Sequence, residues 1–206
     1  MKSFKTTILR LIRAINYIAS AVFFEYPRGI DFSMRDKYSN SNSQLNGYAK
    51  TSTNALKNLF KLVDITNKKF LDIGSGKGAV VYDSFKLGAK ISHGIEYNHK
   101  LHNIAVLNFN RLRCNQTCIS INCDARYFKN YINYDVFYLF NPFNEDIYLQ
   151  VMSNIKDQIA NDINTKWIIA YGKSNESAIM QIGKIKLIFT GICPYRNTTF
   201  SIYQVN

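Results

Sequence analysis

The sequence predicts a three-layer α/β protein, in which a mostly parallel seven-stranded sheet is closed by an antiparallel hairpin at the C-terminus. From Phe70 onward, apolar runs of strand length alternate with helical patterns, which is typical of parallel strands joined by crossover helices. A glycine-rich turn follows the first of these strands. Only a short loop separates the last two strand-like runs, so we expect them to pair as a hairpin.

The first 24 residues form a basic and apolar segment. Lys2, Lys5, Arg10 and Arg13 precede an uncharged run of 11 residues that ends at Phe24. A membrane span needs about 20 apolar residues, and small residues lie inside the run rather than after it, which argues against a secretion signal. The apolar positions follow helical spacing. We expect a helix that either caps the domain near the substrate opening or rests as a basic amphipathic helix on a membrane surface.

The chain divides at residue 50 into a helical arm with a loop, residues 1–50, and an α/β domain, residues 51–206. The stretch Glu25–Gln44 contains Pro, Gly and a Ser/Asn run, which predicts a loop. The stretch Thr51–Val63 predicts a helix with Ser52 or Thr53 as its N-cap. Its apolar face consists of Ala55, Leu56, Leu59, Phe60 and Val63.

The glycine-rich turn lies within Phe70–Val81, FLDIGSGKGAVV. A buried strand enters three alternate glycines, Gly74, Gly76 and Gly78, and an apolar helical stretch begins at once. Glycine allows a tight turn and leaves room for a ligand to approach the backbone. The following helix points its free N–H groups into the same space. The pattern therefore predicts a cofactor-binding turn.

The remaining elements are predicted from the same alternation. The run Asp135–Phe140 is the most apolar, as a central strand covered on both faces should be. The helix after the turn ends near Lys86, before Gly88. Further helices are expected at His99–Leu112, Glu145–Ala160 and Glu176–Ile182, and further strands at Lys90–Glu96, Cys118–Cys123, Lys166–Tyr171, Lys184–Thr190 and Thr198–Val205.

Three kinds of cofactor turn compete for this sequence. A P-loop would need Gly in place of Leu71 and Ser or Thr in place of Gly78, so it is excluded. A dinucleotide fingerprint is met loosely by Gly74, Gly76 and Ala79. The third kind binds a nucleoside that carries a sulfonium and an ammonium. The carboxylate of Asp72 suits these positive charges and would repel a pyrophosphate, which favours the third interpretation.

The stretch Asp72–Gly78 resembles motif I of the class I S-adenosylmethionine-dependent methyltransferases, an acidic residue followed by G-x-G-x-G. The resemblance covers roughly residues 50–206 and includes the final hairpin. It implies a Rossmann-like methyltransferase domain with S-adenosylmethionine as cofactor. The residues that it assigns to the cofactor in this turn are Asp72, Gly74, Ser75, Gly76 and Gly78.

The resemblance also assigns residues at the ends of the next two strands. Glu96, at the end of the second strand, would accept hydrogen bonds from both ribose hydroxyls. Asp124 would accept from the adenine amino group, and the backbone N–H of Ala125 would face a ring nitrogen. Asp is also a common helix N-cap, so a structural role for Asp124 stays open. In such enzymes a helix before the first strand covers the cofactor, which makes Tyr48 and Thr51 candidate ligand contacts.

The fourth strand ends in Asn141, Pro142 and Phe143, which are the candidate catalytic residues. They resemble the (D/N)-P-P-(Y/F) loop of amino-methylating enzymes, in which the Asn and a proline carbonyl accept from the target nitrogen and the aromatic ring stacks on the substrate. Asn141 is also assigned to the cofactor side. This chain has one proline fewer, so nitrogen and oxygen acceptors both stay open. An Asn-Pro-Phe ending is found in a broad bacterial set of these methyltransferases with poorly defined substrates.

The predicted function is methyl transfer from S-adenosylmethionine to a nitrogen or oxygen of a small molecule, a glycan or a protein side chain. The acceptor is unidentified. The net charge of +12 suggests, as an alternative, an RNA- or DNA-directed methyltransferase. The looser fingerprint leaves a third class, an NAD-binding reductase or a regulatory nucleotide-binding module.

The cysteines and histidines do not predict a metal site. Cys114, Cys118, Cys123 and Cys193 lack C-x-x-C spacing, and no fourth ligand accompanies the first three. We expect reduced thiols in a cytoplasmic protein. The sequence makes no prediction of the oligomeric state.

Overall fold

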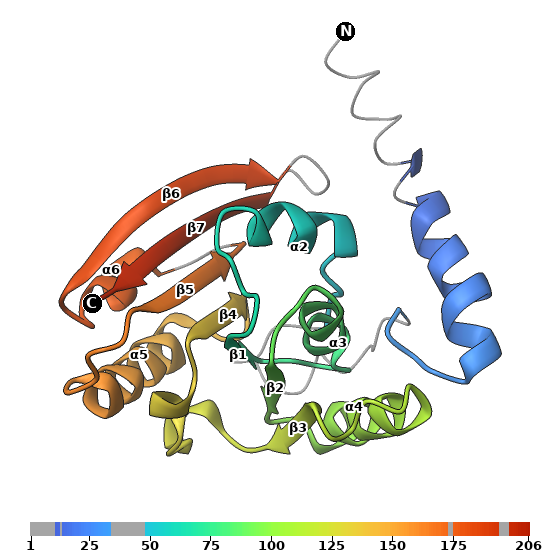
Figure 1. Ribbon diagram of the computed structural model, residues 1–206, viewed down its shortest axis with the longest axis horizontal. Helices are drawn as coiled ribbons and strands as arrows, with labels where there is room; N and C mark the ends of the chain where they lie inside the picture. The colour runs from blue at the N-terminus through green and yellow to red at the C-terminus, as the bar shows by residue number, and fades with distance from the viewer. Residues whose placement is uncertain (1–10, 13, 34–47, 173–174, 194–197) are drawn as a thin grey trace, which may run out of the picture.

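The computed structural model describes residues 11–12, 14–33, 48–172, 175–193 and 198–206. Its centre is a seven-stranded sheet in the order β3-β2-β1-β4-β5-β7-β6 (Figure 1). The first five strands in this order are parallel, and β7 runs antiparallel to both β5 and β6. The predicted fold class and closing hairpin are confirmed. The strands are β1 (Lys69–Ile73), β2 (Ile91–Glu96), β3 (Cys118–Asn122), β4 (Val136–Phe140), β5 (Lys166–Tyr171), β6 (Ile185–Cys193) and β7 (Thr198–Val205).

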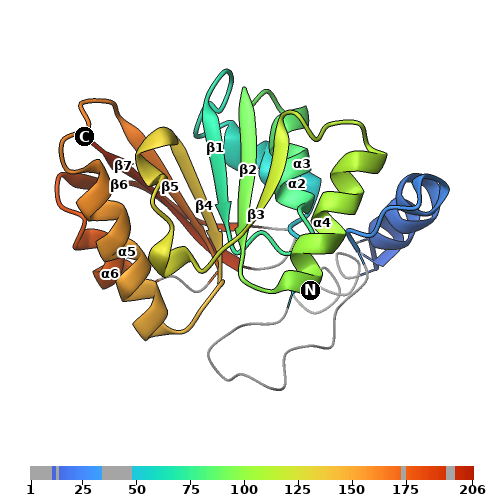
Figure 2. The ribbon, with the colours of Figure 1, turned by 90° about the horizontal axis from the view of Figure 1, so that it is seen from below.

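The central strands are buried because helices cover both faces of the sheet. Four of the five residues of β4 are buried, and its neighbour β1 shows the same pattern. Helices α2 (Thr53–Phe60), α3 (Ala79–Lys86) and α4 (His99–Arg111) lie on one face, and α5 (Glu145–Ile159) and α6 (Glu176–Met180) lie on the other (Figure 2). Near-continuous apolar runs are what a parallel sheet between two helical layers requires.

Side-chain caps fix where several helices begin. The Ser52 Oγ accepts a hydrogen bond from the Ala55 N–H at 3.2 Å, which confirms Ser52 as the N-cap of α2. Asn144 caps α5 in the same way, accepting from the N–H of Ile147. Helix α2 is shorter than predicted because the chain leaves it in a turn after Phe60. The other helices and strands from β1 onward differ from the prediction mainly at their ends.

The N-terminal arm is helical through the described residues from 11 to 28. It ends in a π-helical turn, Ser20–Glu25, and a 3-10 turn, Tyr26–Arg28. The prediction of a loop from residue 25 was wrong for this turn. Pro27 presets a helical φ angle there, and the Glu25 carboxylate accepts the backbone N–H groups of Phe32 and Ser33. Lys2, Lys5, Arg10, Arg13 and residues 34–44 of the predicted loop lie outside the described residues.

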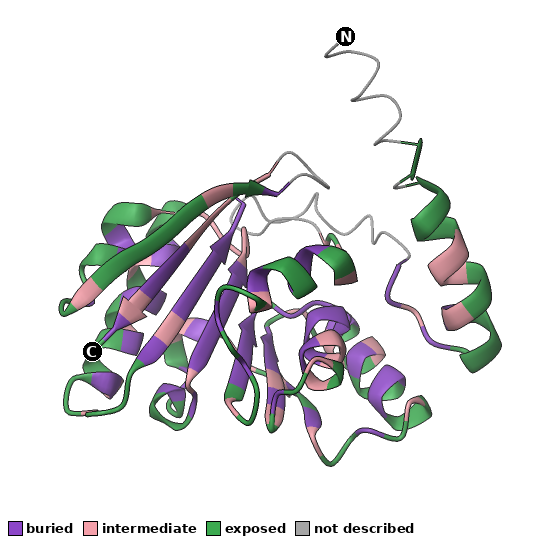
Figure 3. Cartoon of the chain, turned by 45° about the horizontal axis from the view of Figure 1, so that its top comes forward, coloured by how far each residue is buried: buried purple, intermediate pink, exposed green. Residues whose placement is uncertain are grey.

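The arm projects from the domain, and most of its residues before Phe24 are exposed (Figure 3). Among the described residues, no helix combines the length and the apolar composition that crossing a membrane requires. Residues 30–33, in contrast to the arm, are largely buried against the domain. Ile30 and Phe32 are buried and pack with Ala79 at the start of α3, so this short stretch belongs to the packed domain.

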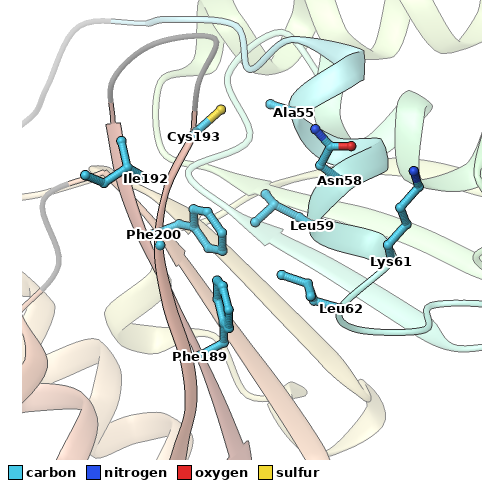
Figure 4. Close-up of a pocket in the computed structure, with 10 residues that line it drawn as sticks. Ala55, Asn58, Leu59, Lys61, Leu62, Phe189, Ile192, Cys193 and Phe200 are labelled. Carbon is cyan, nitrogen blue, oxygen red and sulfur yellow. The ribbon is translucent and has the colours of Figure 1, made fainter.

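Strand β6 forms an exposed edge of the sheet and is longer than predicted. Leu187, Ile188, Phe189 and Ile192 are all exposed on it. Between this hairpin and α2 lies an apolar pocket of about 290 Å³. In Figure 4 the rings of Phe189 and Phe200 face leucines of α2 and the turn after it.

Candidate active site

The glycine turn, residues 74–78, connects β1 to α3 and is fixed by hydrogen bonds to the neighbouring strand. The N–H groups of Gly74 and Ser75 both donate to the Ile95 carbonyl at 2.9 Å. The Gly76 N–H donates to the Glu96 Oε2 at 2.7 Å. The turn is therefore held against the carboxyl end of β2, where a ligand of a doubly wound sheet binds.

Two of the glycines are required by their conformation and by their close neighbours. Gly74 and Gly76 have φ angles of +86° and +54°, which side chains rarely adopt. A Cβ on Gly74 would lie 2.6 Å from the Cβ of Pro142, and one on Gly76 would lie 2.2 Å from the ring of Tyr48. The structure thus brings Pro142 and Tyr48 against the turn.

Two buried carboxylates lie beside the turn, at the ends of adjacent strands. Asp72 is 3% exposed and Glu96 is 8% exposed. Burial raises the pKa of Glu96, although the N–H groups of Gly76 and Asn98 donate to its carboxylate. Burial, and then the negative charge of Glu96, hold the pKa of Asp72 well above its usual range. The pair forms a negative site whose charge is costly in the absence of a cation.

The lysine of the turn forms an ion pair with a different carboxylate. Lys77 is buried, and its Nζ lies 2.6 Å from the Oδ2 of Asp31. Asn108 on α4 strengthens this contact, since its Nδ2 donates to the carbonyls of Asp31 and Lys77 and its Oδ1 accepts from the Asp31 N–H. The stretch of chain after the arm is thereby fastened to the turn. Asp31 and Asn108 were not among the predicted site residues, because neither belongs to a recognisable motif.

Tyr48 and Thr51 both lie close to the turn. The Tyr48 hydroxyl donates to the Phe32 carbonyl at 2.7 Å, so its ring is held across Gly76. Thr51 is buried, and its Oγ1 lies 2.9 Å from the hydroxyl of Tyr138 in β4. Tyr48 therefore covers the turn directly, whereas Thr51 is tied to the underlying sheet.

Ser75 lies inside the turn with its side chain toward the sheet. A Cβ on Gly94 of β2 would lie 2.4 Å from the Ser75 side chain. The Ser75 Oγ is buried and forms no hydrogen bond with any of the described residues. Burying a hydroxyl without a partner is costly, so this atom is a candidate contact for a bound group.

Asp124 has the structural role that the sequence left open. Its carboxylate accepts from the Arg126 N–H at 2.9 Å, as the N-cap of a 3-10 turn, and forms an ion pair with the Arg126 guanidinium at 2.6 Å. Hydrogen bonds from this arginine hold the pKa of Asp124 below its usual range. Ala125 is buried, and its carbonyl accepts from the Tyr131 hydroxyl at 2.7 Å. The cap and ion pair orient the Asp124 carboxylate beside the end of β3.

The Asn-Pro-Phe loop begins in a strained conformation. Asn141 has a φ of +42°, a region that Asn tolerates better than most residues. Its Oδ1 would lie 2.5 Å from a Cβ on Gly172, so its side chain rests on the end of β5. The Phe143 ring packs edge-to-face on Tyr148 of α5, with 6.2 Å between ring centroids.

The strand order gathers these residues at one edge of the sheet. The carboxyl ends of β3, β2, β1 and β4 are neighbours in that order, and they lead into Asp124, Glu96, the glycine turn and Asn141. This edge next to a reversal in strand order is where open α/β sheets bind ligands. The residues predicted for the cofactor and the acceptor therefore follow the ends of neighbouring strands at one edge of the sheet.

No group of three or more His, Cys, Asp and Glu side chains among the described residues is placed to hold a metal ion. The four cysteines are free thiols.

Comparison with known proteins identifies the fold. The chain superposes on an RNA methyltransferase from Salinibacter ruber in complex with S-adenosyl-L-homocysteine, with a TM-score of 0.61 and 14% identity over 76% of this chain and 94% of that one. It matches the ribosomal protein L11 methylase from Lactobacillus delbrueckii subsp. bulgaricus with a TM-score of 0.58 and 13% identity, over 76% and 79% of the two chains.

A third match is fibrillarin from Aeropyrum pernix, with natively bound S-adenosyl-L-methionine. Its TM-score is 0.54 and its identity is 15%, over 68% of this chain and 67% of that one. No protein-family model and no curated protein matches the sequence. At these identities the likeness establishes the class I methyltransferase fold, and the site has to be argued from its own residues.

Replacing Asp72 by Asn should stabilise the ligand-free protein at neutral pH. Because the folded-state pKa of Asp72 is raised, its charge opposes folding increasingly as the pH rises from about 4 through that pKa. We expect the variant to melt about 2–4 °C higher at pH 7 for each kcal/mol gained. The advantage should shrink toward pH 4. A variant that is equally or less stable than wild type at pH 7 would contradict the buried charge.

Replacing Gly76 by Ala should destabilise the protein more than replacing Gly183 by Ala. Both glycines have positive φ angles, but only Gly76 has a side chain, Tyr48, where its Cβ would lie. Conformational strain alone costs either variant about 1–2 kcal/mol of folding free energy. Because of the clash with Tyr48, we expect Gly76→Ala to cost about 2 kcal/mol more than Gly183→Ala. Urea unfolding measures both. Equal losses would show that Tyr48 does not lie on the turn.

Proposed function

We propose that this chain, which has the class I methyltransferase fold, transfers a methyl group from S-adenosylmethionine to a nitrogen or oxygen acceptor. The observation that carries the proposal is the pair of buried carboxylates, Asp72 and Glu96, beside the glycine turn. Both pKa values are raised, and one carboxylate raises that of the other. A positively charged ligand relieves this repulsion, whereas a pyrophosphate would increase it.

The residues present fit the cofactor on its charge and on its polar groups. Glu96 would accept from the ribose hydroxyls, and the hydrogen bonds that it accepts from the Gly76 and Asn98 N–H groups fix its orientation. The Asp124 carboxylate and the Ala125 backbone N–H would form hydrogen bonds with the adenine. The buried hydroxyl of Ser75 is available for a hydrogen bond with the cofactor. Asp72 supplies negative charge to the cationic part. The solved structures that contain S-adenosylmethionine or its product on the same fold support this assignment.

The chain's own contribution to the reaction is alignment. When bound, S-adenosylmethionine supplies a methyl group on a sulfonium, which is already an excellent leaving group. The protein therefore has to hold the acceptor atom in line with the methyl carbon and the sulfur. We assign this role to Asn141, whose oxygen would accept from the acceptor and orient its lone pair. Pro142 fixes the loop against Gly74, and Phe143 lines the acceptor side.

We infer an acceptor on a small molecule, a glycan or a protein side chain. An amine acceptor needs only to arrive deprotonated, so Asn141 suffices to orient it. A hydroxyl acceptor would also need a general base.

A nucleic-acid acceptor is the second candidate, and the net charge of +12 favours it. Binding to RNA or DNA through phosphates falls steeply as salt rises. We expect only weak binding of generic RNA, with no steep salt dependence, if the acceptor is not nucleic acid. A strong, salt-sensitive affinity measured by fluorescence anisotropy would favour the alternative.

Calorimetric titration with S-adenosylhomocysteine and with NADH tests the cofactor assignment. We expect the thioether nucleoside to bind and NADH not to bind. Asp72→Asn should weaken S-adenosylmethionine binding at least tenfold, because it removes a charge that faces the cation. Asp64→Asn, at an exposed carboxylate away from the site, is the matched control. Binding of NADH alone would overturn the proposal.

Removing the Asn141 side chain should impair turnover more than it weakens cofactor affinity. Glycine is the appropriate replacement, because it accepts the φ of +42° that alanine would resist. Transfer of radiolabelled methyl to an acceptor preparation should fall at least tenfold in kcat for Asn141→Gly. Asn164→Gly, at an exposed position, is the control. Full activity of Asn141→Gly would show that another group orients the acceptor.

A further inference from the structure

The arm carries an apolar stripe that the described domain does not cover. Leu11, Ile15, Ile18 and Val22 are spaced by four, three and four residues, so they lie on one face of the helix. Their exposed fractions are 62%, 56%, 60% and 50%. In Figures 1 and 3 the arm stands away from the sheet and its covering helices. Soluble monomers rarely expose apolar side chains in so continuous a patch.

Contacts with the domain involve other positions of the arm. The Tyr17 hydroxyl donates to the Ser33 carbonyl, and the Phe24 ring packs on Tyr82 with 6.0 Å between ring centroids. Glu25 is buried in its hydrogen bonds to Phe32 and Ser33. The arm is therefore held at its C-terminal end, while the stripe is left for another surface.

Aromatic side chains extend the exposed patch toward that end. Phe23 is 78% exposed and Tyr26 is 85% exposed. Aromatic rings of this kind are favoured at the level of lipid headgroups, where one part of the ring is apolar and the other is hydrated. Asn16 and Ser20 lie on the opposite side of the helix by their spacing, together with Ile12, so that side mixes polar and apolar residues while the stripe is wholly apolar.

The charge of the segment indicates the partner. Residues 1–24 contain four basic residues and no Asp or Glu. These four lie outside the described residues, so the positive charge is known from the sequence. Positive charge next to an exposed apolar helix face favours binding to anionic lipid surfaces.

A second copy of the chain fits the stripe less well than a lipid surface does. The 4-3-4 spacing also suits a coiled coil, but within the described residues the stripe covers about two heptads, and coiled coils need at least three to four. Residues 1–24 also offer no acidic side chain to pair with the basic ones of a partner arm. We propose that the arm is an interfacial membrane anchor, with the stripe of Leu11, Ile15, Ile18 and Val22 inserted among the headgroups of an anionic lipid surface.

The anchor would bring the domain to the membrane. Residues 25–33 connect the arm directly to the glycine turn through the ion pair of Asp31 with Lys77. Docking of the arm therefore holds this side of the domain near the lipid. The proposal concerns the arm alone and does not depend on which reaction the domain catalyses.

Vesicle flotation with the full chain tests the proposal. We expect the protein to float with vesicles of phosphatidylcholine and phosphatidylglycerol and to bind pure phosphatidylcholine at least tenfold more weakly. Salt at about 1 M, where the Debye length is roughly 3 Å, should weaken binding to the anionic vesicles. Failure to bind anionic vesicles at low salt would overturn the proposal.

The protein has a net charge of +12, so it could bind anionic vesicles without using the arm. Two double variants with the same change in charge distinguish binding through the stripe from this general attraction. Ile15→Glu with Ile18→Glu alters the stripe, and Ile132→Glu with Ile163→Glu alters two exposed positions of the domain. All four side chains are exposed, so we expect thermal melting to stay unchanged. The arm variant should lose binding at least tenfold, while the domain variant should bind nearly as wild type.

Two results would contradict the anchor. Equal binding of the two double variants would show that the net charge, and not the stripe, attracts the vesicles. Light scattering that shows a wild-type dimer, lost only in the arm variant, together with no vesicle binding, would assign the stripe to a second copy of the chain.

Discussion

The repulsion between two buried carboxylates is the constraint on which the site depends. Asp72 and Glu96 lie at the carboxyl ends of adjacent parallel strands, where Asp72 pairs in register with Gly94, and both are buried. The Gly76 N–H donates to Glu96, so the same carboxylate that raises the pKa of its neighbour also shapes the turn. The fold thus maintains an unfavourable charge where a cation can compensate it, which is a common trade between stability and function.

The surroundings of the turn preserve this negative charge. Lys77 is the basic residue of the glycine turn. Its ammonium forms an ion pair with Asp31, from the segment that follows the arm, instead of with Asp72 or Glu96. Tyr48 lies across Gly76 and Pro142 lies against Gly74. The turn is therefore bounded by the covering segment on one side and the acceptor loop on the other, and both contacts depend on the absence of a Cβ.

The sequence predicted the strand and helix order because apolar periodicity reports burial, and burial between helical layers defines this fold. It also located Asp72, Glu96 and Asn141, since each directly ends or follows a recognisable strand. It could not show the contact of Asp31 with Lys77 or that of Asn108 with both, because these join residues far apart in the chain. It took residues 25–28 for a loop, although they form the end of a π-helical turn and a 3-10 turn, because such short turns leave no periodic signal.

Proton release on binding tests the central claim most directly. Calorimetry of S-adenosylmethionine binding at about pH 5.5, in buffers of different ionisation enthalpy, counts the protons exchanged. A cation beside Asp72 and Glu96 should lower both raised pKa values, so the account predicts a net release of protons on binding. Binding without any release, or with uptake, would show that the ligand's positive charge does not face the two carboxylates.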